Sequence, residues 1–280
     1  MKWMIQRKIW LLLGFVLFLG LLTGAYFRVA EKNEGSGPVE VVFIQTQNDA
    51  DCILLVQEGA AVLIDAGEKG DADHILEVLN DHGVEKLNYF ILSHGDSDHI
   101  GGAAKVLSRI PADRVVEPHD TENSDVAALN KLLAAQGVSI LYPTHNTRLR
   151  AGQMQMIVYP PLEKHYSDSN NSSLAVLVTH GEVNMLFPGD ALRKRSLELE
   201  MVHWPQIDLY KVPHHGRANA ETEVLFELLN PTYAVVTASD CDTIVKEAAQ
   251  KRNTLLFYSV LEEIVFRSDG KQVIKLEREG

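Results

Sequence analysis

Apolar and polar residues recur along residues 39–280 with two different periods, separated by turns. Short β-branched apolar runs predict strands, whereas apolar residues three or four positions apart predict helices. The predicted strands are 41–46, 53–56, 61–64, 88–92, 154–159, 174–179, 183–187, 209–212, 233–236, 254–258 and 263–267. The predicted helices are 72–82, 101–108, 124–135, 192–200, 221–229 and 243–251. This is an α/β chain with more strands than one doubly wound sheet needs, and two sheets sandwiched between helices fit it better.

The N-terminus carries an almost wholly apolar run at residues 9–27, which as a helix of about 28 Å would match the thickness of a bilayer. We expect a transmembrane anchor at 9–27 after a short cytoplasmic tail at 1–8, and a polar linker at 28–38 before a folded domain at 39–280. The basic flank Lys2, Arg7 and Lys8 favours a single-pass membrane protein with its domain on the extracytoplasmic side. Secretion after cleavage near Thr23–Ala25 is the alternative.

The composition is that of a globular protein, and the protein carries a net negative charge. The net charge is -12, and because the first thirty residues hold four basic residues and no acid, residues 31–280 carry -16. This negative charge repels nucleic acid, so broad electrostatic binding of nucleic acid is disfavoured unless metal ions or a local basic patch offset the charge. Cys52 and Cys241 are too few for a disulfide scaffold, although one disulfide between them is compatible with export.

The strongest chemical signal is the segment 93–102 (SHGDSDHIGG), which follows a predicted strand and leads into a predicted helix. It places four potential ligands, His94, Asp96, Asp98 and His99, within six residues. A solvated turn with a capping aspartate would explain one Asp and one His. Two of each favour a metal site, and imidazole with carboxylate suits Zn, Mn or Fe.

Two later strands end in the same kind of turn. Residues 183–187 are followed by Pro-Gly-Asp190, and residues 209–212 by Pro-His214-His215-Gly. Each motif alone is commonplace, but their recurrence at strand ends makes Asp190 and one or both histidines further candidate ligands. The glycines would allow tight turns around a buried ion.

In this order, HxDxDH, Gly-Asp and Pro-His-His-Gly, the motifs resemble the metallo-β-lactamase superfamily, and within it the hydrolase domain of ComEC-type competence (DNA-uptake) proteins. Residues 63–67 (LIDAG), 170–174 (NNSSL) and 211–216 (KVPHHG) extend the resemblance, which covers roughly residues 40–270. It implies an αββα sandwich with two divalent metal ions, Zn or Mn, at the edge of both sheets.

The resemblance also assigns roles by position. His94 and Asp96 would hold one metal, Asp98 and His99 the other with His214 or His215, and Asp190 would bridge them, which makes Asp98 and Asp190 the catalytic candidates. The superfamily's third histidine on the first metal falls where this chain has Asn170 or Asn171, so that site is poorer in nitrogen. Asp65 would orient the ligand loops. Lys211 and Arg217 are candidate phosphate contacts.

The chain departs from the subgroup in three places. Asn48-Asp49-Ala50-Asp51 stands where the subgroup has Gly-Gln-Gly-Asp, Arg217 replaces a serine, and residues 238–242 (ASDCD) replace Tyr-Gly-His-Pro. The altered residues are those expected to touch substrate, so the metal core is better supported than the identity of the substrate.

Together these features predict a metal-dependent hydrolase, in which two ions acidify a water and stabilise the negative charge that develops in the transition state. The first hypothesis is a phosphodiesterase or nuclease, with DNA or another phosphodiester as substrate. The alternatives are a hydrolase of a small or wall-associated ester, such as a phosphorylcholine ester or a lactone, and a non-catalytic binding module. The pattern identifies the cytoplasmic membrane as a partner of the leader and indicates no protein partner.

Overall fold

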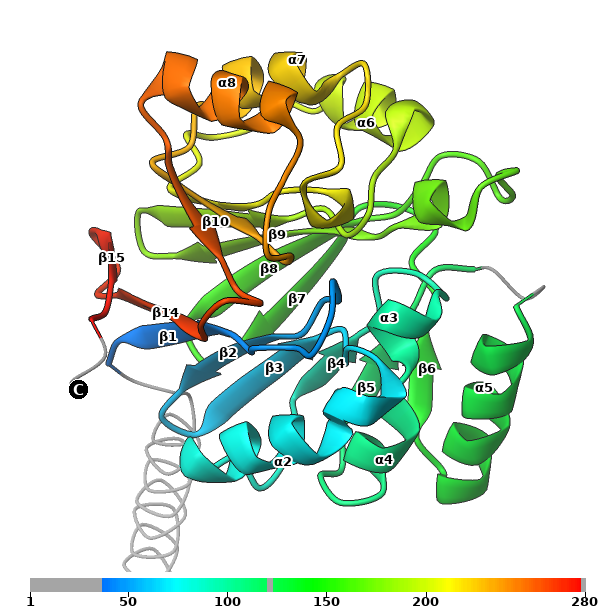
Figure 1. Ribbon diagram of the computed structural model, residues 1–280. Coiled ribbons are helices and arrows are strands. Elements are labelled where there is room, and N and C mark those ends of the chain that lie inside the picture. The colour runs from blue at the N-terminus through cyan, green and yellow to red at the C-terminus, as the bar shows by residue number, and fades with distance from the viewer. Residues whose placement is uncertain (1–36, 120–122, 278–280) are drawn as a thin grey trace, which may run out of the picture.

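The computed structural model describes residues 37–119 and 123–277, which fold into two β-sheets between two layers of helices (Figure 1). Two sheets between helices were predicted, and this part of the prediction is confirmed. The predicted tail and anchor, with most of the linker, lie outside the described residues. Within the part of the chain that is described, no helix has both the length and the apolar character needed to cross a membrane.

The first sheet combines the N-terminal half of the chain with a C-terminal hairpin. In spatial order its strands are β15 (Val273–Lys275), β14 (Ile264–Ser268), β1 (Val39–Phe43), β2 (Ile53–Gln57), β3 (Ala60–Ile64), β4 (Tyr89–Ile91), β5 (Arg114–Val116) and β6 (Ser139–Leu141). Strands β1 to β3 pair antiparallel, whereas β3 to β6 run parallel. The carboxyl ends of β3 and β4 therefore lie side by side.

The second sheet comes from the C-terminal half. Its strands, in order, are β13 (Leu255–Tyr258), β12 (Tyr233–Val236), β11 (Leu209–Lys211), β10 (Val183–Phe187), β9 (Ala175–His180), β8 (Met154–Tyr159) and β7 (Thr147–Ala151). Strands β10 to β13 are parallel, so the turns that follow β10 and β11 are neighbours at one edge. Ligand sites of open α/β sheets form at such carboxyl ends.

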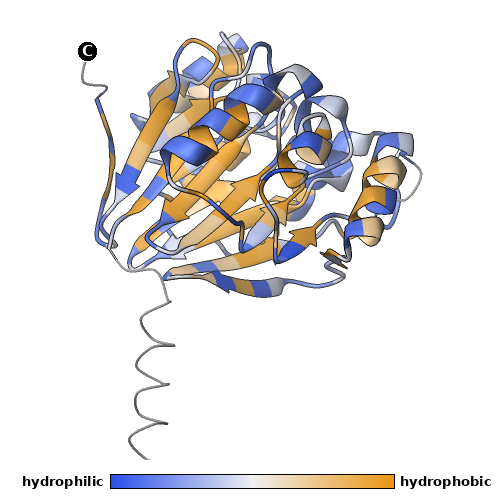
Figure 2. Cartoon of the chain, turned by 90° about the horizontal axis from the view of Figure 1, so that it is seen from below, coloured by the Kyte–Doolittle hydropathy of each residue, from blue (hydrophilic) through white to orange (hydrophobic). Residues whose placement is uncertain are grey.

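Most strands are buried on both faces. In β1, Val41 and Phe43 point into the core between the sheets, whereas Val42 points to the core beneath the outer helices. The ring of Phe43 packs 6.1 Å from Phe187 of the second sheet and 6.3 Å from Phe266. Double burial explains why the strands read as continuous apolar runs, and the strands are correspondingly apolar in Figure 2.

Helices cover the outer face of each sheet. Over the first lie α2 (Ala72–Asp81), α3 (Ser97–Ile100), α4 (Ala103–Leu107) and α5 (Ser124–Gln136), and over the second α6 (Arg193–Glu200), α7 (Thr222–Leu229) and α8 (Thr243–Arg252) (Figure 1). Ile75 and Leu79, one turn apart on α2, are fully buried against the first sheet, and Leu225 and Leu229 on α7 are buried against the second. Cys52 and Cys241 are both free, so the disulfide considered from the sequence is not formed.

Candidate metal centre

The turn after β4 is shaped by close packing around its glycines. Asp96 is extended (φ -76°, ψ 151°) and precedes α3, so the following turn of helix carries Asp98 and His99. A Cβ on Gly101 would lie 2.4 Å from the carbonyl oxygen of Ser97, and one on Gly102 would lie 2.3 Å from that of Ala66. Only glycine fits at these two positions, which explains why the ligand segment ends in Gly-Gly.

The turns after β10 and β11 adopt left-handed backbone. Gly189 has φ +60°, and a Cβ there would meet Ser173 and Ser93 at 2.9 Å. His214 and His215 have φ of 50° and 51°, and they form the 3-10 turn η3 (His214–Gly216). Left-handed backbone in non-glycine residues is uncommon and costs energy, and it occurs here in the turn that aims His215 at the site.

Four side chains converge where the three turns meet. Asp190 Oδ2 lies 3.3 Å from His99 Nε2 and 3.0 Å from His215 Nε2. Asp98 Oδ2 lies 3.1 Å from His215 Nε2 and 3.8 Å from His99 Nε2. Two imidazole nitrogens and two carboxylate oxygens thus face one point. His215, and not His214, reaches this point. The side chain of His214 is half-buried, and its ring lies 6.2 Å from the ring of His215.

His94 and Asp96 lie next to this group. The His94 ring is stacked at a tilt 4.1 Å from the His99 ring, and its Nε2 is 3.5 Å from Asp96 Oδ2. The Nε2 atoms of His94 and His99 are buried and have no hydrogen-bond partner among the described residues. Buried polar atoms without a partner are rare, and a cation would satisfy both. The residues therefore fit divalent metal, and imidazole with carboxylate suits Zn or Mn.

Asp65 lies behind the first ligand turn. Its φ is +60°, and its carboxylate accepts hydrogen bonds from the backbone N–H and the hydroxyl of Ser93, both at 2.7 Å. Asp65 Oδ2 is also 2.9 Å from His99 Nδ1. This contact fixes the orientation of the ring and leaves Nε2 directed at the metal position.

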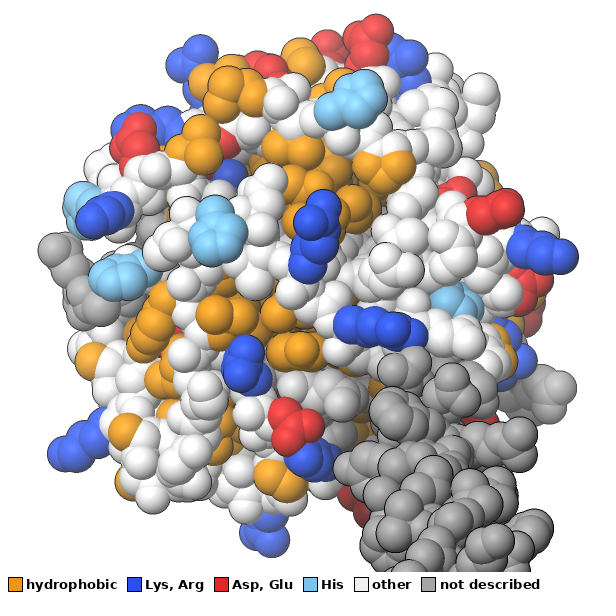
Figure 3. Space-filling model, turned by 180° about the vertical axis from the view of Figure 1, so that it is seen from behind, with side chains coloured by type: hydrophobic (Ala, Val, Ile, Leu, Met, Phe, Trp, Pro, Cys, Tyr) orange, Lys and Arg blue, Asp and Glu red, His pale blue; other side chains and the backbone are white. Residues whose placement is uncertain are grey.

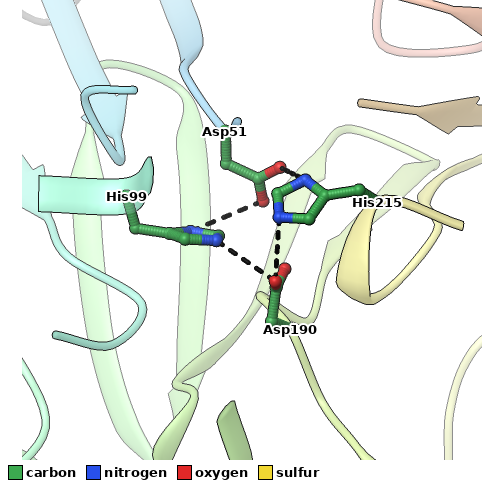
Figure 4. Close-up of side chains that lie close together, drawn as sticks. All are labelled: Asp51, His99, Asp190 and His215. Atoms are coloured by element: carbon green, nitrogen blue, oxygen red, sulfur yellow. Dashed lines mark ion pairs between the residues drawn. The ribbon is translucent and has the colours of Figure 1, made fainter. Parts of the chain in front are cut away.

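Asp51 belongs to the site although the sequence did not single it out as a ligand or a support. With His99, Asp190 and His215 it forms a fully buried group whose potential ligand atoms lie within 4.8 Å of one another (Figure 4). Its oxygens contact the Nδ1 side of His215 at 3.3 Å and the hydroxyl of Thr237 at 2.5 Å. Because the Nε2 atoms point to Asp98 and Asp190 instead, we assign Asp51 to orienting the rings. Asp51 matches the final Asp of the Gly-Gln-Gly-Asp element, and that was the signal available in the sequence.

Lys211 is completely buried and does not have the phosphate-contact role considered for it. Its Nζ lies 2.5 Å from Asp51 and 2.9 Å from Asp190 Oδ1, and donates to the carbonyl of Gly189 at 2.9 Å. A side chain without exposed surface cannot touch substrate. The ammonium holds one oxygen of Asp190 and leaves Oδ2 facing the histidines.

Two opposing effects, burial and the charge of neighbouring groups, set the pKa values in the centre. Burial alone would raise the pKa of Asp190, but Lys211, His99 and His215 hold that pKa well below its usual range. Burial opposes protonation of His215, yet Asp190 and its neighbours raise the pKa of His215 to about 10. A divalent ion would take the place of the protons on these imidazoles.

The other predicted residues surround this centre. Asn171 accepts a hydrogen bond from the backbone N–H of Arg195 at 3.0 Å, and Asn170 lies beside it in the turn η2 (Ser169–Ser172). Arg217 directly follows η3, is 58% exposed and forms an ion pair with Asp49 at 3.2 Å.

Comparisons with known proteins agree with this geometry. The family model of the metallo-beta-lactamase superfamily matches residues 46–239. ComE operon protein 3 of Bacillus subtilis is 30% identical over 59% of this chain, and Recombination protein 2 of Haemophilus influenzae is 27% identical over 66%. The matched regions are only 21% and 22% of those relatives. The metallo-beta-lactamase fold protein YhfI of Bacillus subtilis superimposes on 83% of this chain and all of its own with a TM-score of 0.61 at 13% identity, which shows the fold alone.

Proposed function

The chain belongs to the metallo-β-lactamase superfamily of metal-dependent hydrolases, and from this premise we propose that it binds two divalent ions, Zn or Mn, and hydrolyses phosphodiester bonds in DNA. The observation that carries the proposal is the convergence of His99, His215, Asp98 and Asp190 beside His94 and Asp96. Bound ions would supply an acidified water and positive charge for the transition state.

Formal charge at the centre is compatible with two ions. Five carboxylates and the ammonium of Lys211 leave -4 around the centre, which two divalent cations neutralise. The five carboxylates are Asp51, Asp65 and Asp190, which are buried, and Asp96 and Asp98, which are 33% and 30% exposed.

The residues of the chain would divide the remaining tasks. Asp51 and Asp65 orient the histidine rings, and Lys211 orients Asp190. Arg217, exposed beside the ligand turn, could exchange its contact with Asp49 for a substrate phosphate. We propose DNA as the substrate because of the ComEC-type motifs and because one relative is Recombination protein 2. The region matched by this chain is about a fifth of that relative.

Hydrolysis of a small ester is the second candidate, and the charge of the protein favours it. The net charge is -12, and on the face seen in Figure 3 the basic side chains are spread singly rather than gathered into a track. A polyanion would gain little from such a surface beyond the metal ions.

A substrate panel separates the two candidates. The purified protein, loaded with Zn or Mn, would be assayed against single-stranded DNA, duplex DNA, bis-p-nitrophenyl phosphate, a phosphorylcholine ester and a set of lactones. We expect cleavage of DNA and of the model phosphodiester. Turnover of lactones with no cleavage of either phosphodiester would refute the proposal and favour the small-ester alternative.

A further inference from the structure

A groove runs beside the candidate metal centre, between α5 and the pair of helices α3 and α4 (Figure 1). Its volume is about 740 Å³, which lies within the range of roughly 300–1,000 Å³ that is usual for sites of small molecules. None of the residues assigned to the metal centre lines it. The groove is therefore a second concave site, and the metal ligands do not account for it.

The short helix α3 separates the groove from the metal position. Asp98 and His99 of α3 face the other metal ligands, whereas Ser97 and Ile100 of the same helix line the groove. Because α3 has four residues and is only about 6 Å long, one molecule can place a phosphate at the metal position and another of its groups in the groove.

The opposite wall of the groove is one face of α5. Ala128, Leu129 and Leu132, which are three or four positions apart and share that face, all line the groove. Ala128 is exposed and Leu132 is half-buried, whereas Val126 and Leu133 of the same helix pack into the core of the first sheet. In the described part of the chain, α5 thus presents an aliphatic stripe to the groove.

The groove has the chemistry of a site for an aliphatic chain. No aromatic side chain is among its lining residues, whereas sites for unpaired nucleobases usually stack the base on one. Its aliphatic side chains form no hydrogen bonds, so burying the polar edge of a base against them would cost free energy. The charged residues at the groove are Glu68, Lys69 and Asp125. Two carboxylates and one ammonium do not attract a polyanion.

We propose that this groove binds an aliphatic chain, and that the metal centre therefore also hydrolyses phosphodiesters that carry such a chain. In this reaction the oxygen of a water bonds to phosphorus, one phosphorus–oxygen ester bond breaks, and a proton of the water passes to the leaving alkoxide. A single phosphodiester with an apolar tail is repelled less than a polyanion by a protein of net charge -12. The reaction rests on the proposed function, whereas binding of the chain does not.

A series of alkyl p-nitrophenyl phosphates tests the inference. The full-length protein, loaded with Mn²⁺, would be assayed with the methyl, butyl and octyl esters below their critical micelle concentrations. Burial of one methylene strengthens binding about fourfold, so even half of that effect per carbon in free energy would raise kcat/KM at least about 100-fold from methyl to octyl. Equal kcat/KM for the three esters would overturn the inference.

Substitutions on α5 show whether the effect of chain length comes from the groove. Ala128→Phe fills the groove and should remove most of the preference for the octyl ester. Ala127→Phe is the matched control, because Ala127 is exposed on the same helix but does not line the groove, and it should keep the preference. Elemental analysis checks that both variants bind as much metal as the wild type. The same preference in both variants would mean that the chain binds elsewhere, and the assignment of the groove would be wrong.

Thymidine 5′-(p-nitrophenyl phosphate) tests the other occupant, a nucleobase. If this compound is preferred to the methyl ester, the octyl ester is not, and Ala128→Phe removes the preference, the groove binds a base and the inference is overturned.

Calorimetry with octyl phosphate and methyl phosphate measures binding without turnover. If octyl phosphate binds more tightly but no phosphodiester is cleaved, the assignment of the groove stands and the proposed reaction fails. If bis-p-nitrophenyl phosphate is cleaved but octyl phosphate binds no more tightly than methyl phosphate, the assignment of the groove fails and the proposed reaction stands.

Discussion

Two ligand histidines, His99 and His215, have a carboxylate on both sides of the ring. His99 and His215 direct Nε2 toward Asp190, while Nδ1 faces Asp65 in one case and Asp51 in the other. A carboxylate behind an imidazole fixes the ring and raises its basicity as a ligand. The strongest constraint on the centre therefore comes from residues that do not themselves bind metal.

Loss of a ligand carboxylate should affect catalysis differently from loss of the exposed arginine. Asp98→Ala and Asp190→Ala are expected to abolish hydrolysis, because each removes an oxygen that faces both histidines. Arg217→Ala should raise KM more than it lowers kcat, since its side chain is exposed beside the centre. Steady-state kinetics on bis-p-nitrophenyl phosphate measure both effects. Near-normal turnover by Asp190→Ala at saturating metal would contradict the assignment of Asp190.

Lys211 should matter for stability as well as for the site. Lys211→Met leaves Asp51 and Asp190 buried without their cation, and removing one partner of a buried ion pair costs about 3–5 kcal/mol. Urea unfolding of the metal-free protein would measure the loss. Lys246→Met, which removes an exposed pair with Asp240, is the matched control and should change stability little.

Glu117, which lines a small cavity together with His94, offers a pH-dependent prediction. Burial raises the pKa of Glu117 above 4.5, against hydrogen bonds from Asn130 and Tyr142 that lower it. The folded state therefore binds this proton more tightly than the unfolded state, and stability is lost as pH rises from 4.5 through the raised pKa. Glu117→Gln should be more stable than wild type at pH 8 and about equal to it near pH 4. Denaturant titrations of both proteins across this pH range would measure the difference in stability. If that difference were the same at pH 4 and pH 8, the pKa of Glu117 would not be its cause.

At the scale of helices and strands, the accuracy of the prediction depends on how long each element is and on how regularly its apolar residues recur. The long amphipathic helices and doubly buried strands, such as α2 and β9, lie within a residue or two of their predicted bounds. Strands β5, β6 and β15, of three residues each, were missed, and so was β7, whose five residues (TRLRA) include two exposed arginines and form no apolar run. The ligand turns were visible because each follows a strong apolar strand. Asp51 was not visible as part of the centre, since its role depends on contacts with Thr237 and Lys211 that are far apart in sequence.

The turn η3 gives a test of how backbone positions a ligand. Gly216 has φ +80°, and a Cβ there would lie 2.5 Å from Cys241 Cβ and 2.9 Å from Val236 Cγ1. Gly216→Ala should therefore destabilise the protein by about 2 kcal/mol or more and displace His215, lowering metal content. Gly137→Ala is the control, because Gly137 has φ +71° but open space around its Cβ, and it should keep its metal. Thermal unfolding would measure the loss of stability, and elemental analysis would measure the loss of bound metal.

At the scale of the whole molecule, the two sheets meet at an edge where acidic groups are concentrated. The turn after β4 in the first sheet brings Asp98, and the turn after β10 in the second brings Asp190, to the His215 ring from the turn after β11. Like charges at this density repel one another in the absence of cations. The seam between the sheets is consequently the part of the fold that metal should stabilise most.

Metal binding should therefore raise the stability of residues 39–280 expressed without the apolar leader. A ligand present at 100 times its Kd adds about 2.7 kcal/mol per site, so two sites would add about 5 kcal/mol. For a domain of this size that corresponds to a rise in Tm of roughly 10 °C or more. Scanning calorimetry with Mn²⁺ or Zn²⁺ and with chelator would measure the difference, and Asp190→Asn should lose most of it because Asp190 faces ligands of both turns. An equal Tm with metal and with chelator, in a folded wild-type domain, would mean that the carboxylates at the seam are neutralised by protons and by Lys211 alone, and the two-ion centre would have to be abandoned.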